Sequence, residues 1–148
     1  MKREDRLLYL MSRAQHRLRE YTNASLKAGG AGVSHAQAGI LFLLTEKSPL
    51  SMSELSRRFD VDNSAITGMV DRIEKAGLVT KGAHLTDRRV NLIAITDDGA
   101  REATRCAKII NRINREIKDG FAAGEVDAFA RVLESMFEKF QTEKGGTA

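Results

Sequence analysis

The architecture of this chain follows from residues 51–79, SMSELSRRFDVDNSAITGMVDRIEKAGLV. Ser51 and Glu54 form the capping-box pattern S-x-x-E, in which each side chain satisfies a free backbone N–H of the other residue, and this predicts a short helix. Asp62 can cap a second, longer helix, and Gly77 can terminate it. Two helices joined by a few residues form the helix-turn-helix pattern, which many other helical hairpins share.

The second helix of this pair is predicted to have two chemically different faces. At about 100° per residue, one arc is apolar and contains Ile66, Met69, Val70 and Ile73. The opposite arc contains Asn63, Ser64, Thr67, Gly68, Asp71 and Lys75. Its first three side chains are short and can donate and accept hydrogen bonds at base edges in a DNA groove. The alternative is an ordinary solvated face.

Gly68 favours the first interpretation. A glycine inside a helix costs about 1 kcal/mol relative to alanine, and packing does not offset that cost on an outward face. Close approach of a ligand backbone would explain the glycine. Asp71 argues the other way because its carboxylate repels phosphate, although Lys75, four residues later, can neutralise it.

Strand-like sequence follows Gly77. The runs LVTKGA (78–83) and RVNLIAIT (89–96) flank a polar segment, and the second run is rich in β-branched residues. In that run Val90, Leu92 and Ala94 share one face, and Asn91, Ile93 and Ile95 share the other. The two runs predict a β-hairpin, and a hairpin directly after a helix-turn-helix is a wing.

Asp87, Arg88 and Arg89 stand at the tip of this wing or at its strand entrance. A flat guanidinium suits the narrow, electronegative minor groove of DNA because it is easily stripped of water. Asp87 can accept a hydrogen bond from Arg89 and fix its direction, which lowers the side-chain entropy lost on binding. The alternative is a surface turn with a weak ion pair.

Apolar residues recur at alternating spacings of three and four in three segments outside this module. They are Leu7, Met11, Ala14, Leu18 and Tyr21, then Ala103, Cys106, Ile110, Ile113 and Ile117, then Val126, Phe129, Leu133, Met136 and Phe140. Such a narrow stripe is buried against another helix. Three stripes make a poor core by themselves, so we expect them to pack together and against a second copy in a homodimer. A monomeric bundle is the alternative.

The predicted fold is therefore mainly α with a small β-hairpin wing (α+β). Residues 1–32 form an N-terminal dimerisation helix, residues 33–96 a winged helix-turn-helix DNA-binding module, and residues 97–148 C-terminal dimerisation helices joined near Asp119–Gly120. Within this plan Ser34 caps a short apolar helix that stops before Ser48–Pro49. KAGGAG (27–32) is a loop or hinge, since it lacks the ending of a phosphate-binding loop.

Composition narrows the class of protein. Hydrophobic residues make up 42% and charged residues 30% of the 148, as in soluble globular proteins. No apolar run approaches the roughly 20 residues that span a bilayer, and the start of the chain lacks a signal-peptide pattern. The single cysteine, Cys106, fits a reducing compartment, so we expect a cytoplasmic protein that does not bind membranes. The net charge of +4 permits nucleic-acid binding, but residues 35–96 carry only eight Lys and Arg against seven Asp and Glu.

ELSRRFDV (54–61), DNSAITGMVDRIEKAGLV (62–79), the Asp-Arg-Arg hairpin and Ile95-Thr96-x-x-Gly99 together resemble the MarR family of winged helix-turn-helix transcriptional regulators. The resemblance covers nearly the whole chain. The chain departs from the family in three places: Lys81 stands where arginine is frequent, the wing lacks a proline, and Ile95 replaces the usual leucine.

The resemblance implies a role for particular residues. Arg89 would enter the minor groove while Asp87 positions it, and Arg88 would contact a neighbouring phosphate. The helix after Asp62 would enter the major groove with Asn63, Ser64 and Thr67 at base-reading positions and Arg72 contacting phosphate. A small anionic or phenolic effector would bind where the dimerisation helices meet the winged module, with Arg13, His16 and His35 as candidate contacts.

Other functions have less support. The chain has no H-E-x-x-H, G-x-S-x-G, C-x-x-C or phosphate-loop motif, so we expect no enzyme. Three His and one Cys show no metal-ligand spacing, so we expect neither metal nor cofactor. We therefore predict a regulator, in the first place a repressor, that binds double-stranded DNA as a homodimer. The alternatives are a winged-helix adaptor that binds an acidic protein and a redox sensor acting through Cys106.

Overall fold

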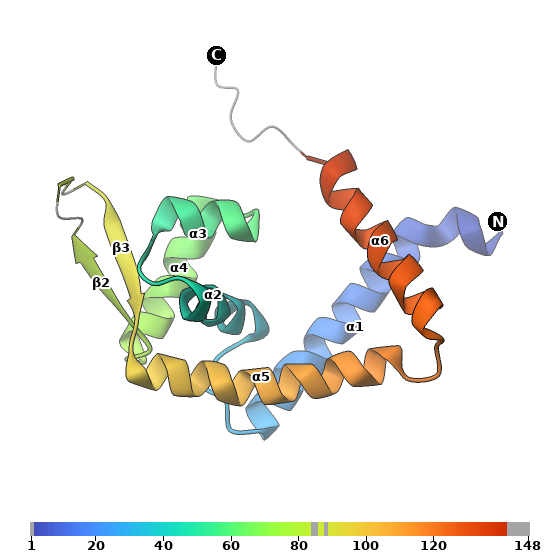
Figure 1. The fold of residues 1–148 in the computed structure, drawn as a ribbon, viewed down its shortest axis with the longest axis horizontal. Helices are drawn as coiled ribbons and strands as arrows, with labels where there is room; N and C mark the ends of the chain where they lie inside the picture. The colour runs from blue at the N-terminus through green and yellow to red at the C-terminus, as the bar shows by residue number, and fades with distance from the viewer. Residues whose placement is uncertain (1, 84–85, 88, 142–148) are drawn as a thin grey trace, which may run out of the picture. The chain divides into compact units, whose positions relative to one another are not determined.

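The computed structural model describes residues 2–83, 86–87 and 89–141, and its contacts divide the chain into two units, Met1–Asn111 and Arg112–Ala148. The elements (Figure 1) are η1 Arg3–Arg6, α1 Leu7–Ala28, α2 His35–Glu46, β1 Leu50–Ser51, α3 Met52–Phe59, α4 Asn63–Lys75, β2 Val79–Ala83, β3 Asn91–Ile95, α5 Asp97–Lys118 and α6 Ala123–Lys139. The prediction of a mainly α fold with a β-hairpin wing is confirmed. The end of the predicted C-terminal segment, residues 142–148, lies outside the described residues.

The starts of α2 and α3 are local capping structures, as predicted. The Ser34 side chain accepts a hydrogen bond from the Gln37 backbone N–H at 3.3 Å, and the Gln37 side chain accepts one from the Ser34 N–H at 2.9 Å. Ser51 and Glu54 repeat this arrangement at 3.1 and 2.8 Å. Both boxes satisfy backbone donors that a helix leaves free at its N-terminus.

The expected capping role of Asp62 is wrong. Asp62 occupies the N-cap position of α4, but its side chain makes no capping hydrogen bond. The turn between α3 and α4 is held instead by Ser56, whose hydroxyl donates to the Asn63 side-chain oxygen at 2.5 Å. The predicted end of α4 is confirmed, because Gly77 follows it in the left-handed conformation with φ of 77°.

The hairpin is part of a small antiparallel sheet with strand order β1-β3-β2. β2 and β3 pair from Val79↔Ile95 to Ala83↔Asn91, which confirms the predicted pairing of the two runs. β1 was not predicted from the sequence; its two residues pair with the other edge of β3 at Leu50↔Ile93. Two residues are too few to show the alternation by which strands are recognised.

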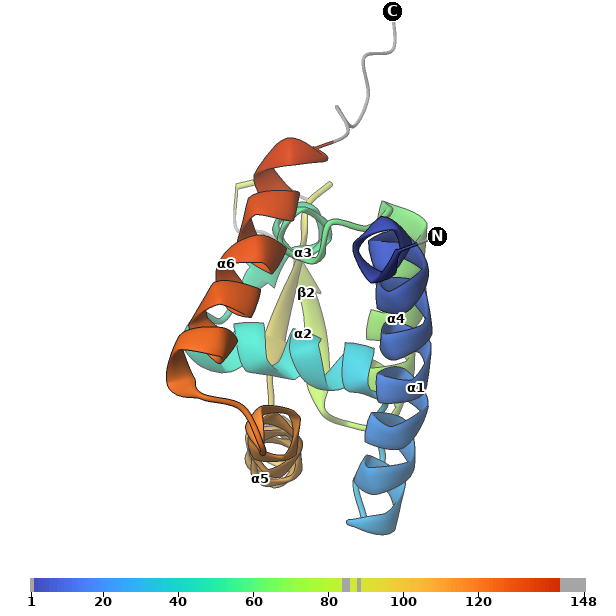
Figure 2. The same ribbon diagram turned by 90° about the vertical axis from the view of Figure 1, so that its right-hand side faces the viewer.

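The core of the first unit lies where α2, α3, α4 and the sheet pack against one another (Figures 1 and 2). Its largest fully buried side chains are Leu26, Ile40, Leu41, Leu44, Leu50, Leu55, Ile66, Ile73, Ile93, Val70, Val79 and Cys106. Ile66, Val70 and Ile73 belong to the predicted inner face of α4, and Met69 is half-buried beside them. The outer face of α4 is thereby directed away from the core.

The Ile95-Thr96-x-x-Gly99 pattern joins the sheet to α5. The Thr96 hydroxyl donates to the Gly77 carbonyl at 2.7 Å and accepts from the Gly99 N–H at 3.0 Å. A Cβ at position 99 would lie 2.0 Å from the Leu78 carbonyl oxygen, so the backbones approach too closely for any larger residue. The motif therefore marks a contact between α5 and the start of the wing.

The glycine-rich segment 27–32 is only partly the predicted loop, because Lys27 and Ala28 still belong to α1 and residues 29–32 form the loop, which is attached to α5. Arg105 donates to the Gly30 carbonyl at 2.7 Å, and Glu102 accepts from the Gly32 N–H at 2.7 Å. A Cβ on Gly29 would lie 2.4 Å from Ile109 Cδ1. The end of α1 is therefore tightly packed on α5 within the first unit.

The apolar stripes of the terminal helices remain largely exposed in the single chain. α5 buries Ala103, Cys106 and Ile113, but Leu7, Leu18, Tyr21, Ile117, Phe129, Leu133 and Phe140 are all at least 36% exposed. α6 has no buried residue at all among those described. The predicted packing of these stripes stays a prediction. None of the helices in the described part of the chain has the length and apolar character needed to span a bilayer.

Candidate nucleic-acid interface

The outer face of α4 presents small polar side chains to solvent. Asn63, Ser64, Thr67 and Gly68 are all exposed, while the opposite face is buried in the core. A Cβ added at Gly68 would meet nothing within 4 Å, so the fold itself does not require glycine there. The face is exposed and its side chains are short, which suits a helix that enters a groove.

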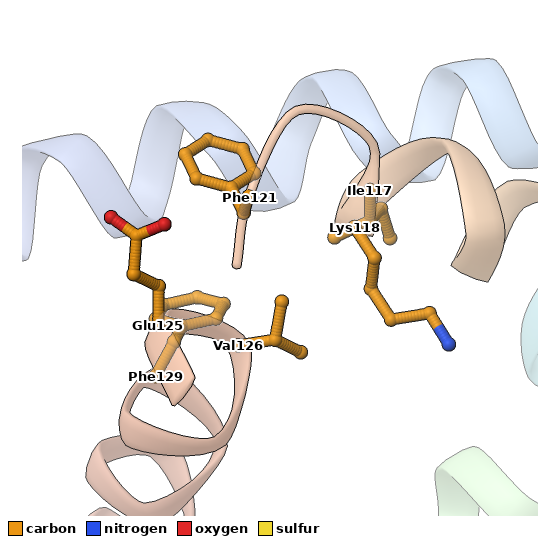
Figure 3. A pocket seen from close by; sticks show the side chains of 6 residues that line it. All are labelled: Ile117, Lys118, Phe121, Glu125, Val126 and Phe129. Carbon is orange, nitrogen blue, oxygen red and sulfur yellow. The ribbon is translucent and has the colours of Figure 1, made fainter. Parts of the chain in front are cut away.

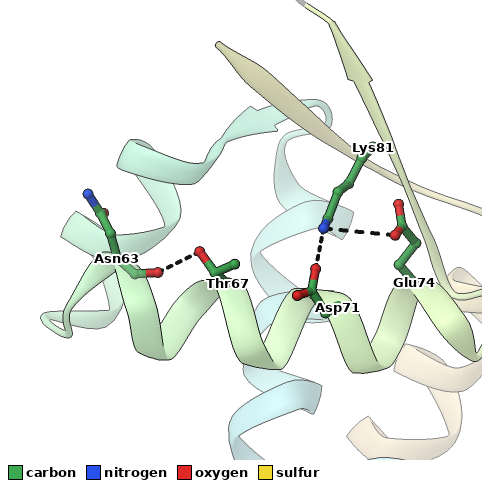
Figure 4. A network of polar contacts seen from close by, with 5 residues as sticks. All are labelled: Asn63, Thr67, Asp71, Glu74 and Lys81. Carbon is green, nitrogen blue, oxygen red and sulfur yellow. Dashed lines mark hydrogen bonds and ion pairs between the residues drawn. The ribbon is translucent and has the colours of Figure 1, made fainter. Parts of the chain in front are cut away.

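Two of these side chains are already hydrogen-bonded, which narrows what they offer. The Thr67 hydroxyl donates to the Asn63 backbone carbonyl at 2.7 Å (Figure 4), so it keeps only its acceptor lone pairs. The Asn63 side-chain oxygen accepts from Ser56, which leaves the amide N–H₂ group as a donor. The expectation that each group both donates and accepts at base edges is therefore too broad. Sequence spacing alone holds no signal for the bond to Ser56.

Asp71 is neutralised, but not by the residue expected. Its partner is Lys81 of β2, whose Nζ donates to Asp71 Oδ1 and lies 3.8 Å from Glu74 Oε1 (Figure 4). The predicted partner, Lys75, was chosen because residues four apart share a helix face, whereas Lys81 reaches Asp71 across the gap between helix and strand. The hydrogen bond that Lys81 donates to Asp71 raises the pKa of Lys81 above its ordinary value.

The predicted contact at the wing is present. Asp87 Oδ1 accepts from the Arg89 backbone N–H at 3.0 Å and from the Arg89 Nε at 3.3 Å. The Arg89 side chain is 93% exposed and that of Asp87 is 43% exposed. The Arg89 guanidinium therefore projects into solvent, while the Asp87 carboxylate holds its Nε and the backbone N–H of the same residue. Arg88 lies outside the described residues. Arg72, in the last turn of α4, is exposed.

The candidate effector contacts lie on α1 (Arg13 and His16) and at the start of α2 (His35). The Arg13 guanidinium lies 5.5 Å from the Tyr9 ring on the same face of α1, and His16 is exposed. The His35 backbone N–H donates to the Asn23 side chain at 2.9 Å. No hydrogen bond or ion pair joins Arg13, His16 and His35 in the described part of the chain.

Cys106 has the environment of an inert thiol. It is fully buried on α5, and burial raises the pKa of its thiol to about 11. The thiolate is the reactive form of cysteine, so this environment disfavours a redox-sensing role. The residues described by the structure contain no cluster of three or more His, Cys, Asp or Glu side chains able to hold a metal ion.

Comparison with known proteins gives a consistent assignment. The family model described as MarR family matches residues 33–90. The HTH-type transcriptional repressor YetL of Bacillus subtilis (strain 168) is 30% identical over 118 residues, which cover 78% of this chain and 70% of YetL. The chain belongs to the MarR family.

Two further likenesses extend this result. The uncharacterized HTH-type transcriptional regulator YdgJ of Bacillus subtilis (strain 168) is 27% identical over 105 residues, or 68% of this MarR family chain. The chain spans 64% of YdgJ, which is less than two thirds of that relative's length. Sco3205 of Streptomyces coelicolor, a MarR family regulator solved in complex with DNA, superposes with a TM-score of 0.87 at 22% identity and covers 100% of this chain and 95% of its own. The two proteins therefore share the same fold.

Proposed function

We propose that this MarR family chain is a transcriptional repressor that binds a pseudo-palindromic operator in double-stranded DNA as a homodimer. The observation that carries the proposal is the wing contact, in which Asp87 accepts a hydrogen bond from Nε of Arg89, a side chain that is 93% exposed. An oriented arginine loses less side-chain entropy on binding than a free one. Its flat, weakly hydrated head suits a narrow minor groove.

The exposed face of α4 supports the second half of the interface. Asn63 offers a donor, Thr67 offers acceptors, and Gly68 allows close approach. A helix in the major groove and an arginine in the adjacent minor groove are the two contacts that a winged helix makes with one half-site. Twofold symmetry would place the second copy of α4 about 34–36 Å along the duplex.

Exposed apolar surface supports the homodimer. At the turn from α5 to α6, a cavity of about 440 Å³ is lined by Ile117, Lys118, Phe121, Glu125, Val126 and Phe129 (Figure 3). Phe121 is 63% and Phe129 is 55% exposed in the single chain. Large exposed apolar patches mark interaction sites, and a second copy of the terminal helices would cover this one.

Control by a small anionic or phenolic effector is the last part of the proposal, and it rests on the resemblance to the family. Arg13, His16 and His35 remain the candidate contacts. A repressor that acts on bacterial DNA works in the cytoplasm, so we place this chain there.

The test is DNA binding by fluorescence anisotropy with duplex from upstream of the chain's own gene. We expect Arg89→Ala to weaken binding at least about tenfold, corresponding to a loss of about 1–3 kcal/mol. The matched control is Arg131→Ala, which removes an exposed arginine that lies 3.2 Å from Asp127 on α6. Equal affinity of Arg89→Ala and wild type at matched salt would overturn the assignment of the wing. Binding to an acidic protein and to no duplex would favour the adaptor instead.

A further inference from the structure

The outer half of α4 carries two carboxylates close to the surface proposed to meet DNA. The side chain of Asp71 is 46% exposed and that of Glu74 is 39% exposed. Asp71 follows Thr67 by one helical turn on the same outward arc. Two uncompensated carboxylates there would repel the phosphates on either side of a groove, and this repulsion would act on every sequence alike.

Lys81 stands between these carboxylates (Figure 4). Its Nζ donates to Asp71 and lies 3.8 Å from Glu74 Oε1, so one ammonium serves both groups. The Lys81 backbone pairs with Ile93 in the middle of the β2–β3 ladder, which fixes where its side chain starts. The cluster of Asp71, Glu74 and Lys81 carries a net charge of −1 instead of −2.

A direct contact between Lys81 and phosphate fits the structure less well. The Lys81 side chain is only 27% exposed, against 93% for Arg89, and its ammonium faces carboxylates. A role in stability alone also fits less well. α4 and β2 already pack through buried apolar side chains, Ile73 and Val79 among them, and partly exposed ion pairs add little to folding.

We propose that Lys81 is a positioning residue for DNA binding, whose ammonium masks the carboxylates of Asp71 and Glu74 so that α4 can approach the phosphates. The proposal rests on the proposed function. Lys81 is then required for DNA affinity although it does not contact DNA. It is required only while the carboxylate of Asp71 is present. Removing the carboxylate should remove the need for the mask.

The test is a double-mutant cycle measured by anisotropy on the operator duplex. We expect Lys81→Met to weaken binding at least about fivefold at low salt. Asp71→Asn should bind as tightly as wild type or more tightly, and Lys81→Met with Asp71→Asn should return to within about twofold of wild type. Lys81→Arg, which keeps the charge, should bind like wild type.

The salt dependence of DNA binding distinguishes charge masking by Lys81 from a structural role in which Lys81 only holds α4 against β2. Repulsion between charges is screened as ionic strength rises, so the deficit of Lys81→Met should shrink between about 50 and 300 mM salt. A purely structural role would leave the deficit unchanged and would leave the double variant as weak as Lys81→Met. Thermal unfolding of each variant shows whether the fold is retained.

The possible results are distinguishable. Suppose that the wild-type chain binds the duplex. If Lys81→Met binds as tightly as wild type, or if the double variant does not regain affinity, the masking role of Lys81 is refuted and the proposed function still stands. If the wild-type chain binds no duplex while remaining folded, the proposed function falls and the mask falls with it. Recovery of the double variant with a salt-sensitive deficit supports both.

Discussion

Replacing Gly68 by alanine should change folding stability and DNA affinity in opposite directions. Gly68 lies inside α4, and an added Cβ would meet nothing within 4 Å. Alanine in a helix interior is favoured over glycine by about 0.8–1.0 kcal/mol, and the open space means that no clash is subtracted from this gain. For a chain of 148 residues, about 1 kcal/mol raises the melting temperature by roughly 2–4 °C.

The same methyl group should weaken DNA binding. Gly68 is exposed on the face proposed to enter the major groove, where an extra carbon displaces either the duplex or an ordered water. We expect at least about tenfold weaker binding, which is about 1.4 kcal/mol. The loss in binding would therefore exceed the gain in folding, which gives a physical reason for a glycine that costs stability.

Thermal unfolding by circular dichroism and anisotropy on the operator duplex measure the two effects on the same sample. The control is Gly124→Ala in the first turn of α6, where a Cβ also meets nothing within 4 Å. That variant should be equally or slightly more stable than wild type and should bind DNA equally well. If Gly68→Ala binds as tightly as wild type, the outer face of α4 makes no close contact with DNA. If it melts at a lower temperature, the space around Gly68 is not open.

Two further predictions concern the interior. Gly99→Ala should destabilise the fold by about 1–3 kcal/mol, because its Cβ would lie 2.0 Å from the Leu78 carbonyl oxygen and 2.8 Å from Ile95 Cγ1, and a melting temperature equal to that of wild type would refute this close approach. Cys106 should react with a thiol reagent at pH 8 about 100-fold more slowly in the native state than in urea. Burial raises the pKa of its thiol from the ordinary 9.0 to about 11, and each increase of the pKa by one lowers the thiolate fraction about tenfold at this pH. Because the folded pKa is the higher one, the stability gained by keeping this thiol neutral is complete below about pH 9 and is lost as the pH rises through 11. Equal reaction rates in the two states would restore the redox alternative.

Much of the candidate interface could be predicted from the sequence because its signals are local. The bond between Asp87 and Arg89 spans two residues, and the capping box of Ser51 and Glu54 spans three. The inner and outer faces of α4 follow from the helical period. Each of these needs only the geometry of one element and its immediate neighbours.

Three departures from the sequence prediction share one cause. Lys81 replaced Lys75 as the partner of Asp71, Ser56 engaged Asn63, and β1 joined the sheet through Ile93. In each case the partner comes from a different element, and which elements meet is set by the packing of the core. A pattern confined to one helix cannot show that a strand passes beside it.

The sequence by itself determined where the helices start and stop, which side of α4 faces inward, and that an aspartate stands two residues before an arginine at the wing. These are consequences of backbone hydrogen bonding and side-chain periodicity, which act within a few residues. Only the tertiary structure decided which polar groups on α4 remain free, since Ser56 and Lys81 reach that helix from α3 and β2. Burial of Ile66, Val70 and Ile73 brings those elements to within hydrogen-bonding distance, and the charge pattern at the surface then depends on contacts that the core has arranged.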